Sequence, residues 1–125
     1  MRKTLIFGIL VMVFILSGCA HRQADLTLVS TRNVRYENIL AARKAQNPAT
    51  VEGYDLQHLV LIFPVSATPN LEEAIDDAMD QAHGDCMIDA VVYSYGWYIP
   101  LIYGQSGWKV TGKVVNTYMP GLEEK

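Results

Sequence analysis

Cysteine and histidine are scarce in this chain, which limits the metal and thiol chemistry that it can carry. The 125 residues include two cysteines and three histidines. A zinc site needs three or four ligands that converge on one point, and the one local cluster of suitable residues is His83-Gly84-Asp85-Cys86. We therefore expect no metal and no cofactor. This cluster supports one alternative for the function of the chain, a small-molecule or metal-binding module around His83, Asp85 and Cys86. The simpler explanation is that these residues form the end of a helix.

Recognisable catalytic motifs are also absent. The sequence contains no Gly-x-Ser-x-Gly, no His-Glu-x-x-His and no glycine-rich phosphate loop. Asp85 and Asp89 are four residues apart and would share one face of a strand, but Asp89 is equally well explained as a polar residue on an exposed sheet face. We expect no catalytic residue, and the sequence predicts that the protein is not an enzyme.

The chain has one long hydrophobic run, at its N-terminus. Met1-Arg2-Lys3 is positively charged, and Thr4 to Leu16 is an apolar stretch without a charged residue. A membrane-spanning helix needs about 20 apolar residues, and this run is shorter. Its length and its basic start are typical of a signal peptide.

The run ends in Leu16-Ser17-Gly18-Cys19, which resembles the lipobox of bacterial lipoproteins. In that family the cysteine thiol is first joined to diacylglycerol, a peptidase then cuts before the cysteine, and the new amino group is often acylated. The residue types suit this chemistry, because a thiol is a strong nucleophile and small residues allow an extended backbone to enter the peptidase. The resemblance implies a signal peptide over residues 1–18, cleavage between Gly18 and Cys19, and lipidation of Cys19.

The resemblance also implies a location. Two or three acyl chains on Cys19 would hold the protein firmly on a membrane, whereas one chain gives marginal binding. In the family, Asp directly after the cysteine favours retention in the inner membrane, and here that position is Ala20. We therefore expect attachment to the outer membrane, on its periplasmic face.

The rest of the chain resembles small uncharacterised bacterial envelope lipoproteins. The resemblance is carried by Ser30-Thr31-Arg32-Asn33, the Ala-Ile-Asp-Asp-Ala segment at 74–78, and the late segment Trp108 to Val115. Such proteins have no established activity, so this resemblance implies no site residue.

Positive charge is in short supply once the leader is removed. Without Arg2 and Lys3 the chain keeps eight basic residues against 13 acidic ones, a net charge of −5. This balance argues against nucleic-acid binding, which requires a basic patch. It also means that the acyl anchor, and not attraction to anionic lipid, must hold the protein on a membrane.

Cys86 has no disulfide partner if Cys19 carries lipid, and it is either a small buried residue or a reactive thiol.

Four segments have the composition of strands, and two of them have a distinctive pattern. Leu59 to Phe63 is a continuous apolar run, which indicates a central strand or one covered on both faces. Trp108 to Tyr118 alternates between apolar and polar residues, as a half-exposed strand requires. The four predicted strands are Asp25–Val34, Tyr54–Val65, Met87–Ile99 and Trp108–Tyr118. The last two should form a hairpin, because their link is short and contains glycine.

One helix is clear from its apolar spacing. Leu71, Ala74, Ile75, Ala78 and Met79 fall on one helical stripe. Asn70 is a suitable N-terminal cap, and Gly84 can adopt the left-handed conformation that ends a helix. A second short helix is expected over Tyr36–Gln46, ending before Asn47-Pro48.

The elements together predict an α+β fold, with a small, mostly antiparallel sheet of about four strands and the main helix packed on one face. The segment from Tyr54 to Ile99 is a candidate crossover. We expect a lipidated tether over residues 19–24, a single domain over 25–118, and a flexible tail over 119–125.

The most informative segment is the link between the last two strands. Six of the sixteen residues from Tyr93 to Trp108 are aromatic, and the connecting loop is apolar. Either this loop folds back over the core, or it is exposed and marks a binding site, where tyrosine and tryptophan are common. In the second case the chain is a membrane-anchored envelope lipoprotein with a non-catalytic interaction or structural-accessory role, and an envelope protein is its candidate partner. The predicted partner-binding residues are Trp97, Tyr98, Leu101, Ile102, Tyr103 and Trp108.

Overall fold

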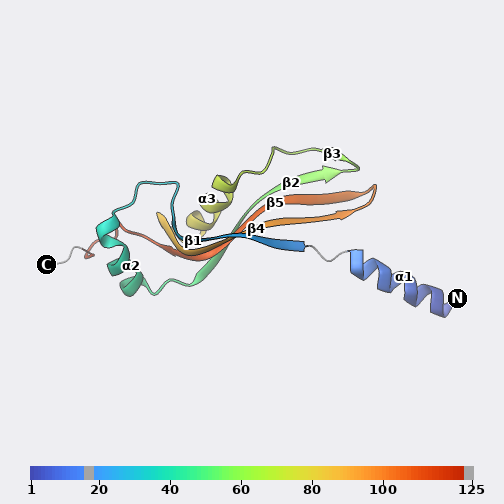
Figure 1. Ribbon diagram of the computed structural model, residues 1–125, viewed down its shortest axis with the longest axis horizontal. Helices are drawn as coiled ribbons and strands as arrows, with labels where there is room; N and C mark the ends of the chain where they lie inside the picture. Colours follow the sequence, from blue (N-terminus) through green and yellow to red (C-terminus); the bar gives the residue numbers. More distant parts are fainter. Residues whose placement is uncertain (16–18, 123–125) are drawn as a thin grey trace.

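The structure is a five-stranded antiparallel sheet with helices at its ends and on one face (Figure 1). It is a computed structural model that describes residues 1–15 and 19–122. The strand order is β1-β4-β5-β2-β3. The strands are β1 (Cys19–Val29), β2 (Thr50–Val60), β3 (Phe63–Pro64), β4 (Cys86–Ile99) and β5 (Tyr103–Val115). The helices are α1 (Arg2–Ile15), the 3-10 turn η1 (Tyr36–Asn38), α2 (Ile39–Gln46) and α3 (Leu71–Gln81).

This arrangement confirms the α+β class, with one strand more than expected. β4 and β5 form the predicted hairpin, with Ile99 opposite Tyr103 at its turn. β2 and β4 both run antiparallel to β5, so they are parallel to each other, and α3 makes the predicted crossover between them. The extra strand, β3, consists of two residues that fold back on the end of β2.

Helix α3 begins and ends through identifiable caps. The side chain of Asn70 accepts a hydrogen bond from the Glu72 N–H, which confirms the predicted cap. At the other end the Gly84 N–H donates to the Met79 carbonyl and the His83 N–H donates to the Asp80 carbonyl. This is the Schellman pattern, but the residue with a left-handed backbone is His83, with a φ of 53°. The prediction for Gly84 was therefore wrong: the turn needs Gly84 because a Cβ there would lie 2.3 Å from Val114 Cγ1.

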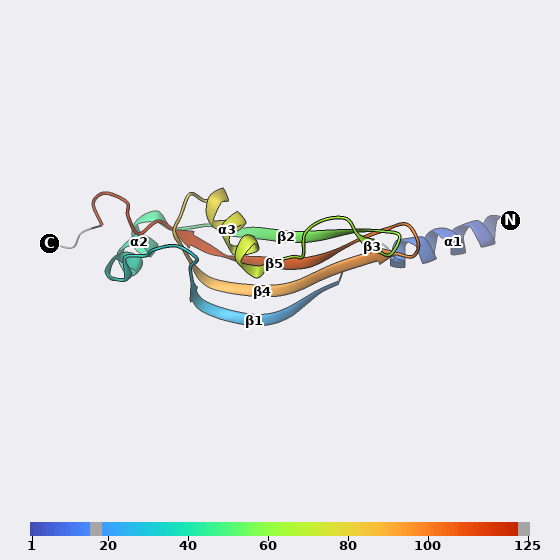
Figure 2. The ribbon, with the colours of Figure 1, turned by 90° about the horizontal axis from the view of Figure 1, so that it is seen from above.

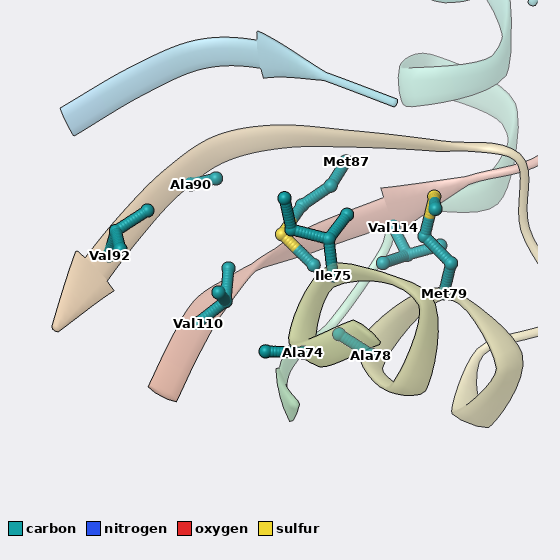
Figure 3. Close-up of a cluster of buried hydrophobic side chains, with 9 residues drawn as sticks. All are labelled: Ala74, Ile75, Ala78, Met79, Met87, Ala90, Val92, Val110 and Val114. Carbon is teal, nitrogen blue, oxygen red and sulfur yellow. The ribbon is translucent and has the colours of Figure 1, made fainter. Parts of the chain in front are cut away.

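The main core lies between α3 and one face of the sheet (Figure 3). Close approach of the helix depends on Gly53, where a Cβ would lie 2.1 Å from the Ala74 carbonyl oxygen. Small residues on the facing side of the helix, Ala74 and Ala78, are fully buried against it. The buried cluster comprises Ala74, Ile75, Ala78, Met79, Met87, Ala90, Val92, Val110 and Val114.

A second, smaller core lies where α2 packs on the sheet. Cys86, Val115 and Ala42 are fully buried there, together with Leu122. Because Cys86 and Met87 are adjacent in β4, they point to opposite faces, and α2 therefore covers the face that α3 does not. Within the expected flexible tail, the apolar side chain of Leu122 is buried and completes this core; residues 123–125 lie outside the described part of the chain.

The first strand begins earlier than the sequence predicts. Residues 19–24 were expected to be a tether and the strand to run to Val34, but β1 spans Cys19–Val29. It is the edge strand of the sheet and pairs with β4, from Cys19 opposite Gly96 to Val29 opposite Met87. Composition misled here because β1 is an edge strand that is mostly exposed, so it does not need the apolar pattern of a buried strand.

The apolar run from Leu59 to Phe63 is not a central strand. Leu61 and Ile62 form the turn between β2 and β3, and Leu61 has a left-handed backbone with a φ of 58°. Ile62 and Phe63 are 65% and 64% exposed. Continuous hydrophobicity normally signals burial, whereas this run lies at the exposed end of the sheet.

Candidate functional site: the open face and the apolar tip

Two features of the sheet remain uncovered by helices, and both contain residues from the predicted aromatic hairpin. We call the sheet face opposite α3, in the part that α2 does not cover, the open face. Its paired aromatic residues are Tyr54, Tyr95, Trp97 and Tyr103. We call the exposed turns at the far end of the sheet the apolar tip, which comprises Leu61, Ile62, Phe63, Val65, Leu101 and Ile102. Figure 2 shows the sheet as a single layer that extends well past α3 toward this end.

The alternation of the strands assigns the aromatic residues to faces. Val92 and Val110 lie in the core beneath α3. Side chains at an odd spacing along a strand point to opposite faces. Trp97 is five positions from Val92 in β4 and Tyr103 is seven positions from Val110 in β5, so both lie on the open face. Trp108 is two positions from Val110, and it packs against the core cluster of α3.

Trp97 and Tyr103 are part of a connected polar and aromatic cluster on the open face. Their ring centroids are 5.6 Å apart in an edge-to-face arrangement, a favourable geometry for aromatic pairs. The Trp97 indole N–H donates to Gln105 Oε1 at 3.1 Å, and Gln105 Nε2 donates to the Tyr103 hydroxyl at 3.2 Å. His58 Nδ1 also hydrogen-bonds to that hydroxyl. The cluster orients both rings on the open face, where each remains partly exposed to solvent.

A second aromatic pair extends the open face toward the middle of the sheet. The rings of Tyr54 and Tyr95 meet edge to face at 6.3 Å, and the Lys109 ammonium lies 5.4 Å from the Tyr54 ring centroid. Lys109 also pairs with Glu52 at 2.8 Å. Hydrogen bonds from Lys109 and then Tyr54 lower the pKa of Glu52 below its usual value, so the carboxylate stays charged and balances the lysine.

The apolar tip joins two turns that are far apart in the sequence. The Leu61 N–H donates to the Ile102 carbonyl at 3.1 Å, and the Tyr98 hydroxyl donates to the Leu61 carbonyl. Leu101 is 72% exposed and Ile102 is 63% exposed. The alternative in which this loop folds back over the core is therefore wrong for these two residues.

The six predicted partner-binding residues thus fall into three groups. Trp97 and Tyr103 lie on the open face, and Tyr98, Leu101 and Ile102 lie at or beside the apolar tip. Trp108 belongs with the core and leaves the candidate site. Sequence reasoning missed Leu61, Ile62 and Phe63, although an uncharged apolar run interrupted by Pro64 is a signal for an exposed turn as well as for a strand.

His83, Asp85 and Cys86 do not converge on one point. His83 is exposed at the end of α3, Cys86 is fully buried in the second core, and the Asp85 carboxylate accepts hydrogen bonds from the Thr117 N–H and hydroxyl. Burial, and then the charge of Asp85, raise the pKa of Cys86 to about 11, which keeps the thiol protonated at neutral pH. Residues 1–15 and 19–122 contain no group of three His, Cys, Asp or Glu side chains that could hold a metal ion.

Cys19 is exposed at the first position of β1. The other lipobox residues, Leu16, Ser17 and Gly18, lie outside the described residues, and so does the predicted cleavage bond. Helix α1 lies beyond the end of the sheet where β1 begins (Figures 1 and 2). Among the described residues, no helix is both long and apolar enough to span a bilayer.

Comparison with known proteins identifies no relative of this chain. No family model, curated protein or solved structure matches it.

Proposed function

We propose that this chain is a lipid-anchored envelope lipoprotein with a non-catalytic role in binding or structural support. The anchor is the acylated Cys19, and Ala20 after it favours the outer membrane, with the domain facing the periplasm. The lipobox-like residues and the exposed position of Cys19 support the anchoring. A surface cysteine at the start of the first strand leaves its thiol accessible for lipid, and the anchored domain would begin directly at the membrane.

The observation that carries the binding role is the aromatic surface of the open face. Trp97, Tyr103, Tyr54 and Tyr95 pair on one side of a sheet whose opposite side packs against α3. Tyrosine and tryptophan dominate the energetics of protein interfaces because they bury a large area with few rotatable bonds. Hydrogen bonds to Gln105 and His58 hold the Trp97–Tyr103 pair before any partner arrives, and such preorganisation lowers the cost of binding. An envelope protein that docks on this face is the proposed partner.

Replacing Trp97 with Ala is expected to remove the interaction without unfolding the protein. Trp97 is only partly buried, and loss of a central interface tryptophan costs about 2 kcal/mol or more of binding free energy. Full-length protein would be crosslinked in intact cells, and the partner and the crosslinked positions would be read by mass spectrometry. We expect crosslinks to the open face in the unaltered protein and their loss in Trp97→Ala.

Two controls accompany this experiment. Tyr118→Ala removes an aromatic side chain that is 49% exposed near the C-terminus, and it should keep the crosslinks. Cys19→Ser should lose them together with the lipid. Crosslinks that survive Trp97→Ala, or that map away from the open face, would contradict the proposed binding role.

A further inference from the structure

The apolar tip has the surface chemistry of a membrane-inserting element. Its six side chains are all at least 49% exposed, although they belong to two separate turns that meet through the Leu61–Ile102 backbone hydrogen bond. Exposed apolar patches of this kind mark interaction sites. Charge is also absent: no Asp, Glu, Lys or Arg occurs from His58 to Pro69 or from Tyr93 to Trp108.

The residues behind the tip match the interfacial zone of a bilayer. Tyr98 lies at the edge of the tip and is 39% exposed, and Trp97 and Tyr103 follow on the open face. Tyrosine and tryptophan concentrate at the level of lipid headgroups, where an apolar ring with one polar atom is best accommodated. The order from the end of the sheet is therefore aliphatic turns first, aromatic residues next, and charged residues such as Lys109 and Asp55 only farther back along the strands.

The position of Cys19 indicates a membrane as the occupant, because the proposed lipid anchor lies at the same end of the sheet. Cys19 pairs with Gly96, three residues before the end of β4 at Ile99. At a rise of about 3.3 Å per residue, the tip reaches roughly 10 Å beyond Cys19 along the strand direction. Interfacial protein segments bury their apolar faces about 5–10 Å into the boundary between headgroups and acyl chains. Helix α1 extends past this same end, and α2 lies at the opposite end (Figures 1 and 2).

We propose that the apolar tip inserts into the lipid bilayer beside the acyl chains of Cys19 and acts as a second membrane contact. Acyl chains on Cys19 alone would attach the domain at one point and leave it free to rotate about that point. Insertion of both turns would instead set the sheet upright, with α2 away from the membrane. The orientation would present the open face sideways to a partner in the same membrane. This inference rests on the proposed anchoring of Cys19.

The test measures the membrane depth of single spin labels in the full-length protein. Ile102→Cys and Ile62→Cys place a thiol at the tip. Leu40→Cys places one on α2 at the opposite end, where the apolar side chain is similarly exposed at 71%. Cys86 is buried and Cys19 is acylated in the proposed form, so the introduced thiol is the reactive one. Each labelled protein would be reconstituted in vesicles of phosphatidylethanolamine and phosphatidylglycerol.

We expect labels at residues 62 and 102 to collide several-fold more with oxygen, relative to a water-soluble nickel complex, than the label at residue 40. Equal nickel access at all three positions would overturn the proposal. Labels shielded from both reagents, with spin–spin broadening between copies, would place a second copy of this chain on the tip and would also overturn it. Acylation of Cys19 is tested separately by exposing the unaltered protein to the spin label. Labelling of Cys19 would show that its thiol carries no lipid, whatever the membrane depth of the apolar tip.

Discussion

Gly53→Ala is expected to destabilise the domain by about 3 kcal/mol, at the upper end of the usual cost of overpacking a core. A Cβ on Gly53 would lie 2.1 Å from the Ala74 carbonyl oxygen and 2.6 Å from the Ala78 backbone nitrogen. These are backbone atoms of α3, so no side-chain rotation can relieve the contact, and the whole helix must move away from the sheet. Movement of α3 would loosen the core that includes Ile75 and Met79.

Thermal unfolding of the purified protein, followed by circular dichroism, measures this effect. A loss of about 3 kcal/mol in a domain of this size corresponds to a fall in Tm on the order of 15 °C. Gly96→Ala is the matched control, because a Cβ there has no neighbour closer than 3.4 Å, and its Tm should stay near that of the unaltered protein. An unchanged Tm in Gly53→Ala would show that α3 does not pack on β2 as described.

Asp85→Ala should cost a similar amount, about 3 kcal/mol, because it leaves buried donors without an acceptor. The Asp85 carboxylate accepts from the Thr117 N–H at 2.8 Å and from the Thr117 hydroxyl. Thr117 in turn accepts a hydrogen bond from the Arg35 N–H at its hydroxyl oxygen and one from Asn38 Nδ2 at its carbonyl. The carboxylate therefore joins the start of β4 to the segment after β5 and, through Thr117, to the residues that precede α2.

Equilibrium unfolding in urea would measure the Asp85→Ala effect. Asp25→Ala is the control: it breaks an ion pair with Arg22 in which both side chains are 60% exposed, and such surface pairs contribute at most about 1 kcal/mol. If both variants lose the same small amount, the Asp85–Thr117 contact does not stabilise the fold. Loss of stability in Asp85→Ala alone would show that Asp85 has a structural role. That role would account for an acidic residue between His83 and Cys86 without a metal or small-molecule site.

The sequence was most informative where local chemistry decides the structure. Helix α3 has an apolar stripe, a capping Asn70 and acidic residues in its first turn, and these signals agree with one another. The β4–β5 hairpin was also predictable, since its turn is short and its strands are rich in β-branched and aromatic residues. The second short helix was found too, within the limits set by Pro48.

The features missed by the sequence depend on what lies beside a segment in space. β1 has little apolar character, and it is a strand because β4 offers an unpaired edge to it. Leu61 and Ile62 have the composition of a buried strand, yet they form an exposed turn against Ile102. Trp108 lies in the core and Trp97 on the open face because of the strand register and the position of α3. The residue pattern of a single strand does not show which of its two faces a helix covers. For this reason only part of the candidate site was predictable. The sequence identified the aromatic hairpin, but not the turn at Leu61 and Ile62 that contacts it.

The central claim is that Cys19 carries lipid, and counting free thiols in protein purified from membranes tests it most directly. Cys86 is fully buried, and its raised pKa of about 11 keeps it protonated, so a maleimide should not react with it in the native state. The account predicts no labelled thiol in native protein and one in denaturant. It also predicts an intact mass equal to a chain that starts at Cys19 and carries diacylglycerol. One labelled thiol in native protein and two in denaturant, with the mass of the uncleaved 125-residue chain, would contradict it.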